Sequence, residues 1–463
     1  MAKPHLVLIG NGMAGARLLE EILKRDPDTY RISVFGQESH GNYNRIMLSP
    51  VLAGEMTADE IMLNPLHWYD ENNITLYSGD PVVEINHQAQ KVISLNGLEV
   101  AYDKLILATG SSPVIPPVAK TSTLEGILSF RTLDDVDRII GKAAQAKHAL
   151  VLGGGLLGLE AAYGLRKSGI EVTVIHRGKW LLNRQLDETA ASLLKDELES
   201  RGINVRLGCE VETFCGVKSS VSSRLVTDAS PSKVGLNKNQ LGSATLSDGS
   251  VLSTELAIIA IGIQPNTKLA QTSGLDCERG ILVNDRMQSS HHNIYALGEC
   301  TQFGRDTFGL VAPLWDQAHV LADQLTSTAD SRYRVKPCAT KLKVSGIDLF
   351  SAGEFLDNED SESLVFKDLH QGSYKKLIFR NQQLVGTVLY GAVQDGNWYF
   401  ELIQQQRQIQ HLSPDLIFGM RYIDEASLTD LDSSSDSSDT DATTFASVAN
   451  TTHSNVLNTG VTL

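Results

Sequence analysis

Two copies of one glycine signature constrain this chain more than any other feature. The first copy is Gly10-Asn11-Gly12-Met13-Ala14-Gly15, and the second is Gly153-Gly154-Gly155-Leu156-Leu157-Gly158. In a strand-turn-helix unit the first glycine permits a tight turn, the second lets the backbone approach a pyrophosphate, and the third lets helix pack on strand. Because backbone N–H groups and the helix dipole then meet the anion, we expect the chain to bind two dinucleotides.

The residues around the first copy have the pattern of a complete β-α-β unit. An unbroken apolar run at residues 5–9 predicts a buried parallel strand, and apolar residues at helical spacing continue from Ala16 until Asp26-Pro27. A second strand is predicted from Arg31 to Phe35, and Glu38 follows it. A carboxylate at this place accepts hydrogen bonds from ribose hydroxyls, so the first site favours an adenosine with a free 2′-hydroxyl, as in FAD or NAD.

The second copy has the same frame but lacks the acid. A strand at 149–152, a helix from about 156 to 167 and a strand at 170–175 are predicted around it. His176 and Arg177 then occupy the tip of the second strand, and Lys179 follows. These cations suit the 2′-phosphate of NADPH, but the site equally tolerates NADH without a ribose carboxylate, so the choice between the two stays open.

Composition excludes several classes of function. The chain of 463 residues is long enough for two or three domains. Its formal charge of −15 and pI near 5.3, without a stripe of Lys and Arg, argue against nucleic-acid binding. No apolar run approaches the ~18 residues of a membrane helix, and the N-terminus enters a strand too early for a signal peptide. Five scattered cysteines fit a reducing compartment, so a cytoplasmic location without a metal site is expected.

The rest of the chain supplies further strands, a loop and a tail. Apolar strands that end in small-residue turns are predicted at 102–111 and 256–262, and each closes one nucleotide-binding half. A third strand ends at Gly298-Glu299, where the carboxylate can accept hydroxyls. Short alternating strands from about 332 to 419 predict a third, α+β domain. The serine-rich stretch at 215–243 is interpreted as a surface loop, and the Ser, Thr and Asp-rich end of the chain as a disordered acidic tail.

These elements in this order resemble the two-dinucleotide flavoproteins, in which a nicotinamide domain is inserted within an FAD domain. The stretches Gly10–Gly15, Asn42–Glu55 and Gly309–Trp315 look like the flavin module of assimilatory NAD(P)H nitrite reductase large subunits, and equally like the electron-transfer subunit of assimilatory nitrate reductase. The resemblance covers about residues 1–425. The middle stretch makes it more specific than the glycines alone, because that stretch differs in disulfide reductases and in ferredoxin or rubredoxin reductases.

The resemblance implies an α/β fold with two Rossmann-like dinucleotide-binding domains and a C-terminal α+β interface domain. Residues 1–115 and 265–330 are then expected to form the FAD-binding domain, and residues 116–264 the NAD(P)H-binding domain. Residues 331–425 are expected to form the interface domain, followed by the acidic tail at 426–463.

The resemblance also implies roles for individual residues at the FAD site. The expected contacts are to the pyrophosphate, the adenosine ribose, the other phosphate oxygens, the adenine, the isoalloxazine side and the ribityl chain. A helix over about Leu310 to Gln324 is expected to direct its positive end at the flavin. The residues for FAD are Gly10, Gly12, Gly15, Glu38, Arg45, Val82, Thr109, Gly110, Gly298, Glu299 and Trp315.

For NAD(P)H the implied contacts are fewer, and one of them has an unusual neighbour. In relatives a glutamate near the nicotinamide often pairs with a lysine beside the flavin. Here the glutamate is Glu160, but the position of the lysine is Pro50, so an ion-pair mechanism is doubtful, and a plain helix-surface acid is the alternative. The residues implied for NAD(P)H are Gly153, Gly155, Gly158, Glu160, Arg177 and Gly262.

Hydride transfer between stacked rings needs orientation and exclusion of water from the protein rather than a nucleophile. The stretch 41–60 contains no cysteine, which excludes a dithiol relay. The expected function is therefore an NAD(P)H oxidoreductase that passes electrons to a separate acceptor, by the resemblance the molybdenum-containing catalytic subunit of assimilatory nitrate reductase. The alternatives are an NAD(P)H reductase for a small carrier such as ferredoxin or rubredoxin, and a non-catalytic flavin-binding regulator.

Overall fold

The computed structural model describes residues 3–217, 239–344, 346–368, 370–409, 414–423 and 428–429. The predicted loop at 215–243 and the predicted acidic tail therefore lie largely outside the described residues. The chain divides into two compact units. The first contains Met1–Asn183 and Ala191–Lys336, and the second contains Arg184–Ala190 and the chain from Pro337 onward.

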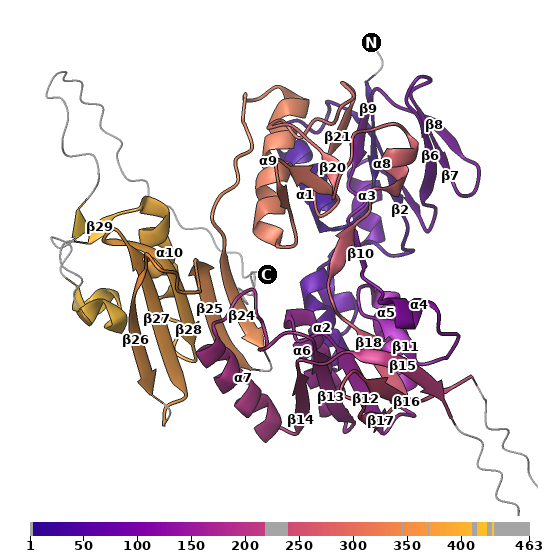
Figure 1. Cartoon of the computed structure of the whole chain (residues 1–463). Coiled ribbons are helices and arrows are strands. Elements are labelled where there is room, and N and C mark those ends of the chain that lie inside the picture. The colour runs from indigo at the N-terminus through magenta and orange to yellow at the C-terminus, as the bar shows by residue number, and fades with distance from the viewer. Residues whose placement is uncertain are drawn as a thin grey trace, which may run out of the picture. The chain divides into compact units, whose positions relative to one another are not determined.

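The first unit contains two five-stranded parallel sheets (Figure 1). The first sheet has the order β21-β9-β1-β2-β5, and each neighbouring pair is parallel. Every residue of its central strand β1 is buried, as the unbroken apolar run predicted. The strands are β1 (His5–Ile9), β2 (Arg31–Gly36), β5 (Ile74–Ser78), β9 (Lys104–Leu107) and β21 (Ile294–Ala296).

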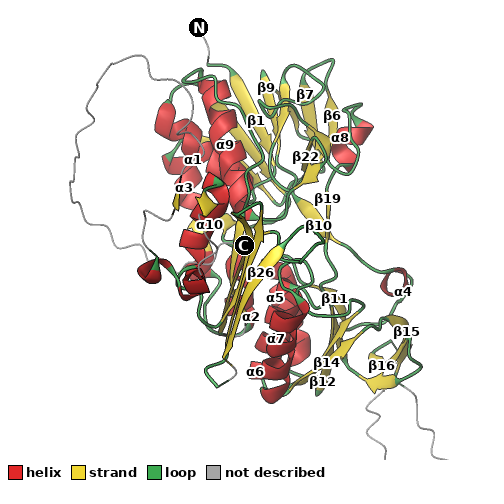
Figure 2. Cartoon of the chain, turned by 60° about the vertical axis from the view of Figure 1, so that its left-hand side comes forward, coloured by secondary structure: helices red, strands yellow, loops and turns green. Residues whose placement is uncertain are grey.

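The two faces of the first sheet have separate hydrophobic cores. Leu6 and Leu8 of β1 pack with α1 (Met13–Arg25) and α9 (Val311–Thr326), which lie side by side in Figure 2. Val7 and Ile9 point to the other face, because side chains alternate along a strand. That face is covered by α8 (Lys268–Thr272) and by the meander β6 (Val82–Asn86), β7 (Lys91–Ser94) and β8 (Glu99–Ala101).

The second sheet repeats the design with the order β11-β18-β12-β13-β14. Helix α6 (Leu156–Lys167) follows β12 and packs against β12 and β13. The strands are β11 (Ile127–Ser129), β12 (His148–Leu152), β13 (Glu171–His176), β14 (Ile203–Leu207) and β18 (Leu256–Ile259), with α5 (Leu133–Ala143) and α7 (Glu188–Ser200) as further helices. The predicted pair of Rossmann-like sheets is confirmed.

Short elements connect and flank the two sheets. Strands β10 (Ser111–Pro113) and β19 (Ile263–Pro265) pair antiparallel where the chain passes from one sheet to the other. The remaining elements of this unit are η1 (Arg45–Met47), α2 (Leu48–Leu52), η2 (Asp59–Ile61), α3 (Leu66–Glu71), α4 (Pro117–Lys120), β3 (Asn42–Tyr43), β4 (Met62–Asn64), β15 (Val211–Gly216), β16 (Leu241–Leu246), β17 (Val251–Ser253), β20 (Ile281–Leu282), β22 (Thr301–Phe303) and β23 (Asp306–Thr307).

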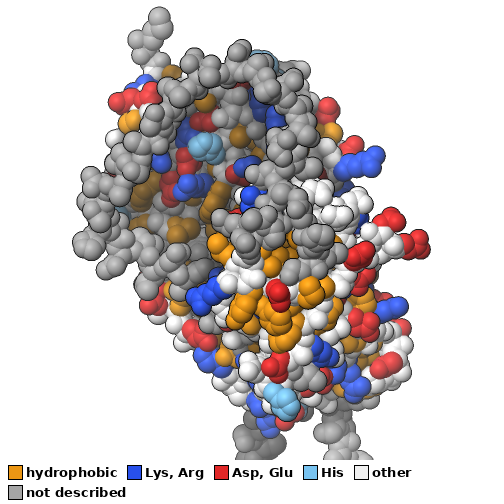
Figure 3. All heavy atoms as spheres, turned by 90° about the vertical axis from the view of Figure 1, so that its left-hand side faces the viewer, with side chains coloured by type: hydrophobic (Ala, Val, Ile, Leu, Met, Phe, Trp, Pro, Cys, Tyr) orange, Lys and Arg blue, Asp and Glu red, His pale blue; other side chains and the backbone are white. Residues whose placement is uncertain are grey.

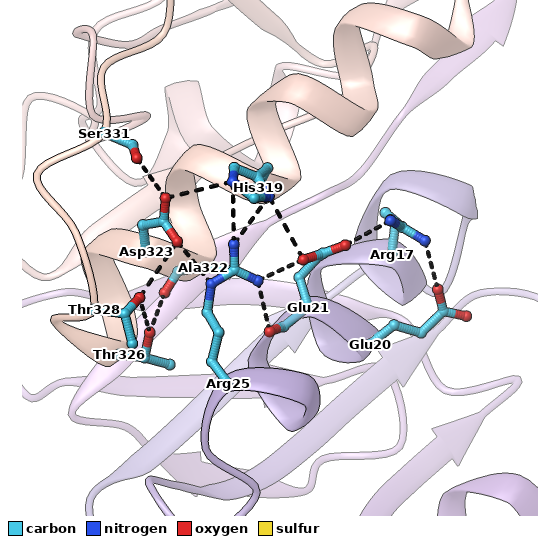
Figure 4. A network of polar contacts seen from close by, with 10 residues as sticks. All are labelled: Arg17, Glu20, Glu21, Arg25, His319, Ala322, Asp323, Thr326, Thr328 and Ser331. Carbon is cyan, nitrogen blue, oxygen red and sulfur yellow. Dashed lines mark hydrogen bonds and ion pairs between the residues drawn. The ribbon is translucent and has the colours of Figure 1, made fainter. Parts of the chain in front are cut away.

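A buried ion network joins α1 to α9. The Arg25 guanidinium donates from Nε to Asp323 Oδ1 at 2.7 Å and from Nη1 to Glu21 Oε2 at 2.5 Å. Figure 4 shows that these side chains and His319 point toward one another from the two helices. The side chains of Glu21 and Asp323 are each only 7% exposed, and Arg25 pairs with both of them, while Arg17 Nη2 also lies 2.5 Å from Glu21 Oε1.

Substitution of Arg25 by methionine is expected to destabilise the first unit by about 3–5 kcal/mol, because the buried carboxylate of Asp323 then loses its guanidinium partner, whereas Glu21 keeps Arg17. The measurement is the free energy of unfolding of the intact chain in urea at pH 7. Lys24→Met is the matched control, since Lys24 is the adjacent, exposed residue of the same helix turn. Equal losses in the two variants would contradict the assigned role of the network.

The second unit is an antiparallel sheet with a helix packed on it. The sheet order is β24-β25-β28-β27-β26, and α10 contacts β25 and β28. This arrangement agrees with the α+β character predicted from the alternating pattern. The elements are β24 (Ala339–Val344), β25 (Ile347–Gly353), β26 (Glu362–Asp368), β27 (Ser373–Arg380), β28 (Gln383–Tyr390), α10 (Gly396–Gln405), β29 (Gln408–Ile409), η3 (Pro414–Phe418), η4 (Met420–Tyr422) and β30 (Leu428–Thr429).

Asp187 fastens the segment Arg184–Ala190 within this second unit. Its Oδ2 accepts a hydrogen bond from the Tyr374 hydroxyl at 2.6 Å and lies 3.4 Å from Lys376 Nζ. Its Oδ1 accepts from the Ala190 N–H at 3.0 Å, at the start of α7. The carboxylate is buried, and these three donors satisfy it.

The second unit also exposes large apolar side chains. Figure 3 shows hydrophobic side chains gathered on one face of the molecule. The ring of Phe418 lies 5.8 Å from that of Phe366 and 5.9 Å from that of Tyr422, between centroids. The large hydrophobic residues of this unit that are exposed are Leu356, Val365, Phe418, Met420 and Tyr422.

Candidate functional site

The first glycine signature forms a tight turn with an open side. Gly10 has φ of +111°, and a Cβ added to it would lie 2.1 Å from the Ala108 carbonyl oxygen. A Cβ on Gly15 would lie 2.6 Å from the Gly10 oxygen, whereas a Cβ on Gly12 would meet nothing within 4 Å. Gly12 is the N-cap of α1 and provides no side-chain cap, so the first N–H groups of the helix face open space. An anionic pyrophosphate fits there.

The second signature repeats this geometry closely. Gly153 has φ of +127°, and its added Cβ would lie 2.1 Å from the Ala260 oxygen. A Cβ on Gly158 would lie 2.1 Å from the Gly153 oxygen, while one on Gly155 would meet nothing within 4 Å. Gly155 is the uncapped N-cap of α6. The chain therefore contains two equivalent anion cradles, one at each parallel sheet.

The acid expected at the first ribose lies in a polar group after β2. Glu38 accepts a hydrogen bond from the Tyr43 hydroxyl at 2.6 Å and an ion-paired hydrogen bond from Arg45. Arg45 also donates to the Arg131 carbonyl at 3.0 Å. Burial raises the pKa of Tyr43 above its ordinary value, so this phenol stays neutral and donates. The structure thus brings Glu38 and Arg45 together.

Glu299 lies beside a second arginine that the sequence reasoning missed. Its carboxylate accepts from Ser111 Oγ at 2.7 Å and from Arg131 Nη2. The preceding Gly298 has φ of +89° and donates its N–H to the buried Gln317 side chain of α9 at 2.7 Å. This bond connects α9 to the residue that precedes Glu299. Arg131 is separated from Glu299 by 168 residues, so no local pattern could have indicated the pair.

Three of the residues predicted for the FAD site line one cavity at the carboxyl ends of the strands of the first sheet. The cavity of about 780 Å³ is bordered by Gly10, Val82 and Thr109. Lys268, the first residue of α8, and Arg279, which lies in the chain after that helix, also line it, and the sequence reasoning missed both. Gly110, with φ of +64°, directly follows Thr109.

Two residues bear on redox function: Trp315, which is expected at the FAD site, and Cys300, which directly follows Glu299. Trp315 is half-buried in α9, and the Arg17 guanidinium lies 5.7 Å from its ring centroid. Cys300 is completely buried, its thiol faces the carbonyl oxygens of Leu107 and Leu297, and burial raises its pKa. A buried, protonated thiol packs rather than reacts. None of the five cysteines forms a disulfide.

The carboxylate of Glu160 contacts a hydroxyl group rather than a cationic side chain. Its Oε2 accepts a hydrogen bond from Ser49 Oγ at 2.5 Å, where α2 packs on α6. Gly164 permits this approach, since a Cβ there would already lie 3.2 Å from Leu52 Cγ. Among the described residues Glu160 has no ion-pair partner. Burial raises the pKa of Glu160 to about 7, and the bond from Ser49 lowers it only in part.

This raised pKa predicts a pH-dependent stability. The folded chain holds the Glu160 proton more tightly than the unfolded chain, so stability falls as pH rises from 4.5 to about 7. The Glu160→Gln variant lacks this loss. The free energy of unfolding of the variant minus that of the parent should therefore increase by roughly 2–3 kcal/mol from pH 5 to pH 8. Unfolding in urea at both pH values measures it. Glu212→Gln, at an exposed carboxyl, is the control, and parallel pH curves for Glu160→Gln and the parent would refute the expectation.

The second cradle differs from the first in the loop that follows its second strand. Arg177 is exposed directly after β13, and no acid occurs from His176 to Leu186. Gly262, with φ of +128°, lies beyond β18 and accepts a hydrogen bond from the Val114 N–H at 2.9 Å. Thus the structure brings Gly153, Gly155 and Gly158 together, places Glu160 two residues beyond Gly158 in α6, and puts Arg177 at the neighbouring strand end.

The described residues contain neither a cluster of metal ligands nor a helix that could span a membrane. No group of three or more His, Cys, Asp or Glu side chains is arranged to hold a metal ion. No described helix is both long and apolar enough to span a bilayer.

Comparisons with known proteins agree with this geometry. Residues 4–324 match the model of the pyridine nucleotide-disulphide oxidoreductase family, and residues 338–407 match the rubredoxin NAD+ reductase C-terminal domain. The NAD(P)H nitrite reductase of Bacillus subtilis strain 168 is 41% identical over 89% of this chain and 49% of its own length. The assimilatory nitrate reductase electron transfer subunit of the same strain is 40% identical over 90% of this chain and 51% of its own length. The chain thus spans about half the length of these relatives.

Solved structures share the fold. The putidaredoxin reductase–putidaredoxin complex matches with a TM-score of 0.77 and 24% identity, over 90% of this chain and 96% of that one. NADH:rubredoxin oxidoreductase from Clostridium acetobutylicum matches with a TM-score of 0.71 and 24% identity, over 89% of this chain and 98% of that one.

Proposed function

The chain belongs to the pyridine nucleotide-disulphide oxidoreductase family, and from that premise we propose that it is the NAD(P)H-oxidising flavin component of an assimilatory nitrate-reducing system. As a member of this family it is an FAD-dependent NAD(P)H oxidoreductase. One observation carries the proposal: the first unit contains two anion cradles, and these are open at Gly12 and at Gly155. A non-catalytic flavin-binding regulator does not fit this family.

The chain's own residues bind and orient in this proposal. When bound, FAD supplies the acceptor for a hydride from nicotinamide and passes the electrons onward. The N–H groups at the start of α1 and α6 hold the two pyrophosphates, and Arg45 with Glu38 recognises the adenosine end of FAD. Helix α9, which begins without a side-chain cap, directs its positive end toward the flavin. Ser49 and Glu160 fill the contact between α2 and α6 and exclude water there.

The other residues expected from the sequence keep their proposed roles. Val82 and Thr109 contribute to the FAD site because they line the same cavity as Gly10. The residues proposed for FAD are Gly10, Gly12, Gly15, Glu38, Arg45, Val82, Thr109, Gly110, Gly298, Glu299 and Trp315. Those proposed for NAD(P)H are Gly153, Gly155, Gly158, Glu160, Arg177 and Gly262.

The domain division is part of the proposal. The FAD-binding domain is residues 1–115 with 265–330, and the NAD(P)H-binding domain is residues 116–264. The two parallel sheets and the β10–β19 connection support this division. The interface domain is residues 331–425, with the tail at 426–463. A cytoplasmic location is also proposed, and it is supported by the five cysteines, none of which forms a disulfide.

The proposed acceptor is the catalytic subunit of assimilatory nitrate reductase. The name of the second Bacillus relative, at 40% identity, supports this choice. A second candidate is a reductase for a small iron–sulfur carrier, which the match of residues 338–407 to the rubredoxin NAD+ reductase C-terminal domain favours. The two candidates share the hydride step and differ only in the protein that takes the electrons.

Stopped-flow reduction followed by mixing with acceptors tests the proposal. Under anaerobic conditions NADH or NADPH is expected to decrease the absorption of the oxidised flavin at about 450 nm. The reduced protein is then mixed with a purified nitrate reductase catalytic subunit, with rubredoxin or with a plant-type ferredoxin. Fast reoxidation by the nitrate reductase subunit alone supports the proposal. Fast reoxidation by a carrier alone favours the second candidate, and a flavin that neither nucleotide bleaches refutes both.

A further inference from the structure

We propose that the second cradle selects NADPH over NADH, with Arg177 and Lys179 as the residues that recognise the 2′-phosphate of its adenosine. This inference rests on the proposed function and specifies its reductant. Four observations carry it: a loop fixed by hydrogen bonds, two exposed cations without an ion-pair partner among the described residues, no acid in the loop, and a contrasting loop at the first cradle.

The loop that follows β13 is fixed onto the second cradle. The Gly154 N–H donates to His176 Nδ1 at 3.2 Å, and the Leu182 N–H donates to the Gly154 carbonyl at 2.9 Å. The Gly208 N–H donates to the Gly178 carbonyl at 3.1 Å, which ties the loop to the neighbouring strand end. Both ends and the middle of the loop are therefore held in place before any ligand binds, which limits the entropy cost of recognition.

The His176 ring is an internal support of this loop rather than a third cation. A Cβ on Gly154 would lie 2.8 Å from His176 Cγ, and one on Gly178 would lie 2.5 Å from Nε2, so both glycines pack directly on the ring. Burial, together with the charge of Arg177, lowers the pKa of His176. The neutral ring therefore accepts the Gly154 N–H at Nδ1 and carries its own hydrogen on Nε2.

Arg177 and Lys179 are the charged groups that the loop presents to solvent. Both side chains are exposed, and neither has an ion-pair partner among the residues that the structure describes. The first acid after His176 is Asp187, whose oxygens already accept from Tyr374 and Ala190. Two unpaired cations on a fixed loop beside an anion cradle create a site for additional negative charge.

The first cradle of the same chain provides the contrast. There the loop after β2 carries Glu38, two residues beyond the end of the strand at Gly36. The corresponding place beyond β13, which ends at His176, is Gly178 between the two cations. A carboxylate at this point accepts ribose hydroxyls and repels a 2′-phosphate, whereas cations attract it. The two loops are thus built for adenosines of different charge.

The first test measures binding without turnover. Adenosine 2′,5′-bisphosphate and 5′-AMP are titrated calorimetrically into the FAD-loaded protein, because they differ only in the 2′-phosphate. The bisphosphate is expected to bind at least about tenfold more tightly at low salt, and to lose that advantage in Arg177→Ala and Lys179→Ala. Lys147→Ala is the matched control, since Lys147 is an exposed lysine just before β12, at the opposite end of the same sheet.

The second test compares the reductants with ferricyanide as acceptor. The parent protein is expected to show a kcat/KM at least about tenfold higher for NADPH than for NADH. Arg177→Ala should lower the value for NADPH about tenfold, mainly through KM, and lower that for NADH by a smaller factor, so that the preference for NADPH is lost. Equal or better use of NADH by the parent, with equal binding of the two adenosine probes, overturns the inference while leaving the proposed function intact. If neither nucleotide reduces the flavin, the proposed function itself fails.

Discussion

Replacement of Gly12 by valine is expected to give a folded protein that is purified without its flavin. A Cβ at this position meets no atom within 4 Å, and Gly12 has φ of −84°, which other residues adopt readily. The chain therefore tolerates the side chain, whereas a pyrophosphate on the first turn of α1 does not. We expect the ratio of FAD to protein to fall to below about one-tenth of the parent value, since steric exclusion costs well over the ~1.4 kcal/mol of a tenfold change.

Gly10→Val is the matched comparison for Gly12→Val. Its side chain would point at the Ala108 carbonyl, and φ of +111° strains any β-branched residue, so loss of the fold itself is expected. Circular dichroism and the flavin absorption of the purified variants separate the two outcomes. Gly12→Ala provides a milder form of the same test. A Gly12→Val protein that retains a full complement of FAD would show that the pyrophosphate does not lie on this turn.

Replacement of Gly155 by valine is expected to separate flavin binding from flavin reduction. The first cradle is unchanged, so the protein should be purified yellow and should bleach with dithionite. Because the added side chain occupies the open side of the second cradle, kcat/KM for NAD(P)H should fall by about 100-fold or more. Stopped-flow reduction at several nucleotide concentrations measures the loss.

Gly141→Val is the control for the Gly155 variant. Gly141 lies in α5, and an added Cβ there also meets nothing within 4 Å, but it faces no cradle. Its reduction kinetics should match those of the parent. Wild-type rates in the Gly155→Val protein would assign the nicotinamide nucleotide to another place on the chain, and would also remove the basis for the inference about Arg177.

The sequence allowed prediction of the elements whose signal is local. The apolar runs of β1 and β12, the glycine turns and the helices α1 and α6 each occupy a short stretch with a definite period or a fixed glycine spacing. The structure places them as predicted. Helix α9, predicted over Leu310 to Gln324, spans Val311–Thr326 and so ends two residues later, after the buried Leu325.

The contacts that the sequence did not indicate are those between distant positions. Ser49 and Glu160 are separated by 111 residues, and the identity of residue 50 as proline gave no hint that the adjacent serine would take the place of a cation. Arg131 reaches Glu299 across 168 residues. Single-chain periodicity contains no information on such pairs, since they depend on how two sheets are packed and not on either element alone.

The seven-residue segment Arg184–Ala190 has a practical consequence for dissection of the protein. It belongs to the second unit, although the chain on both sides of it belongs to the first. A stop codon after Lys336 would therefore remove Tyr374 and Lys376 but keep Asp187. The carboxylate of Asp187 would then lose two of its three donor groups. Anyone who wishes to express the flavin and nicotinamide portion as a shortened recombinant product must also redesign this insertion, and truncation at the apparent boundary alone would yield a defective fragment.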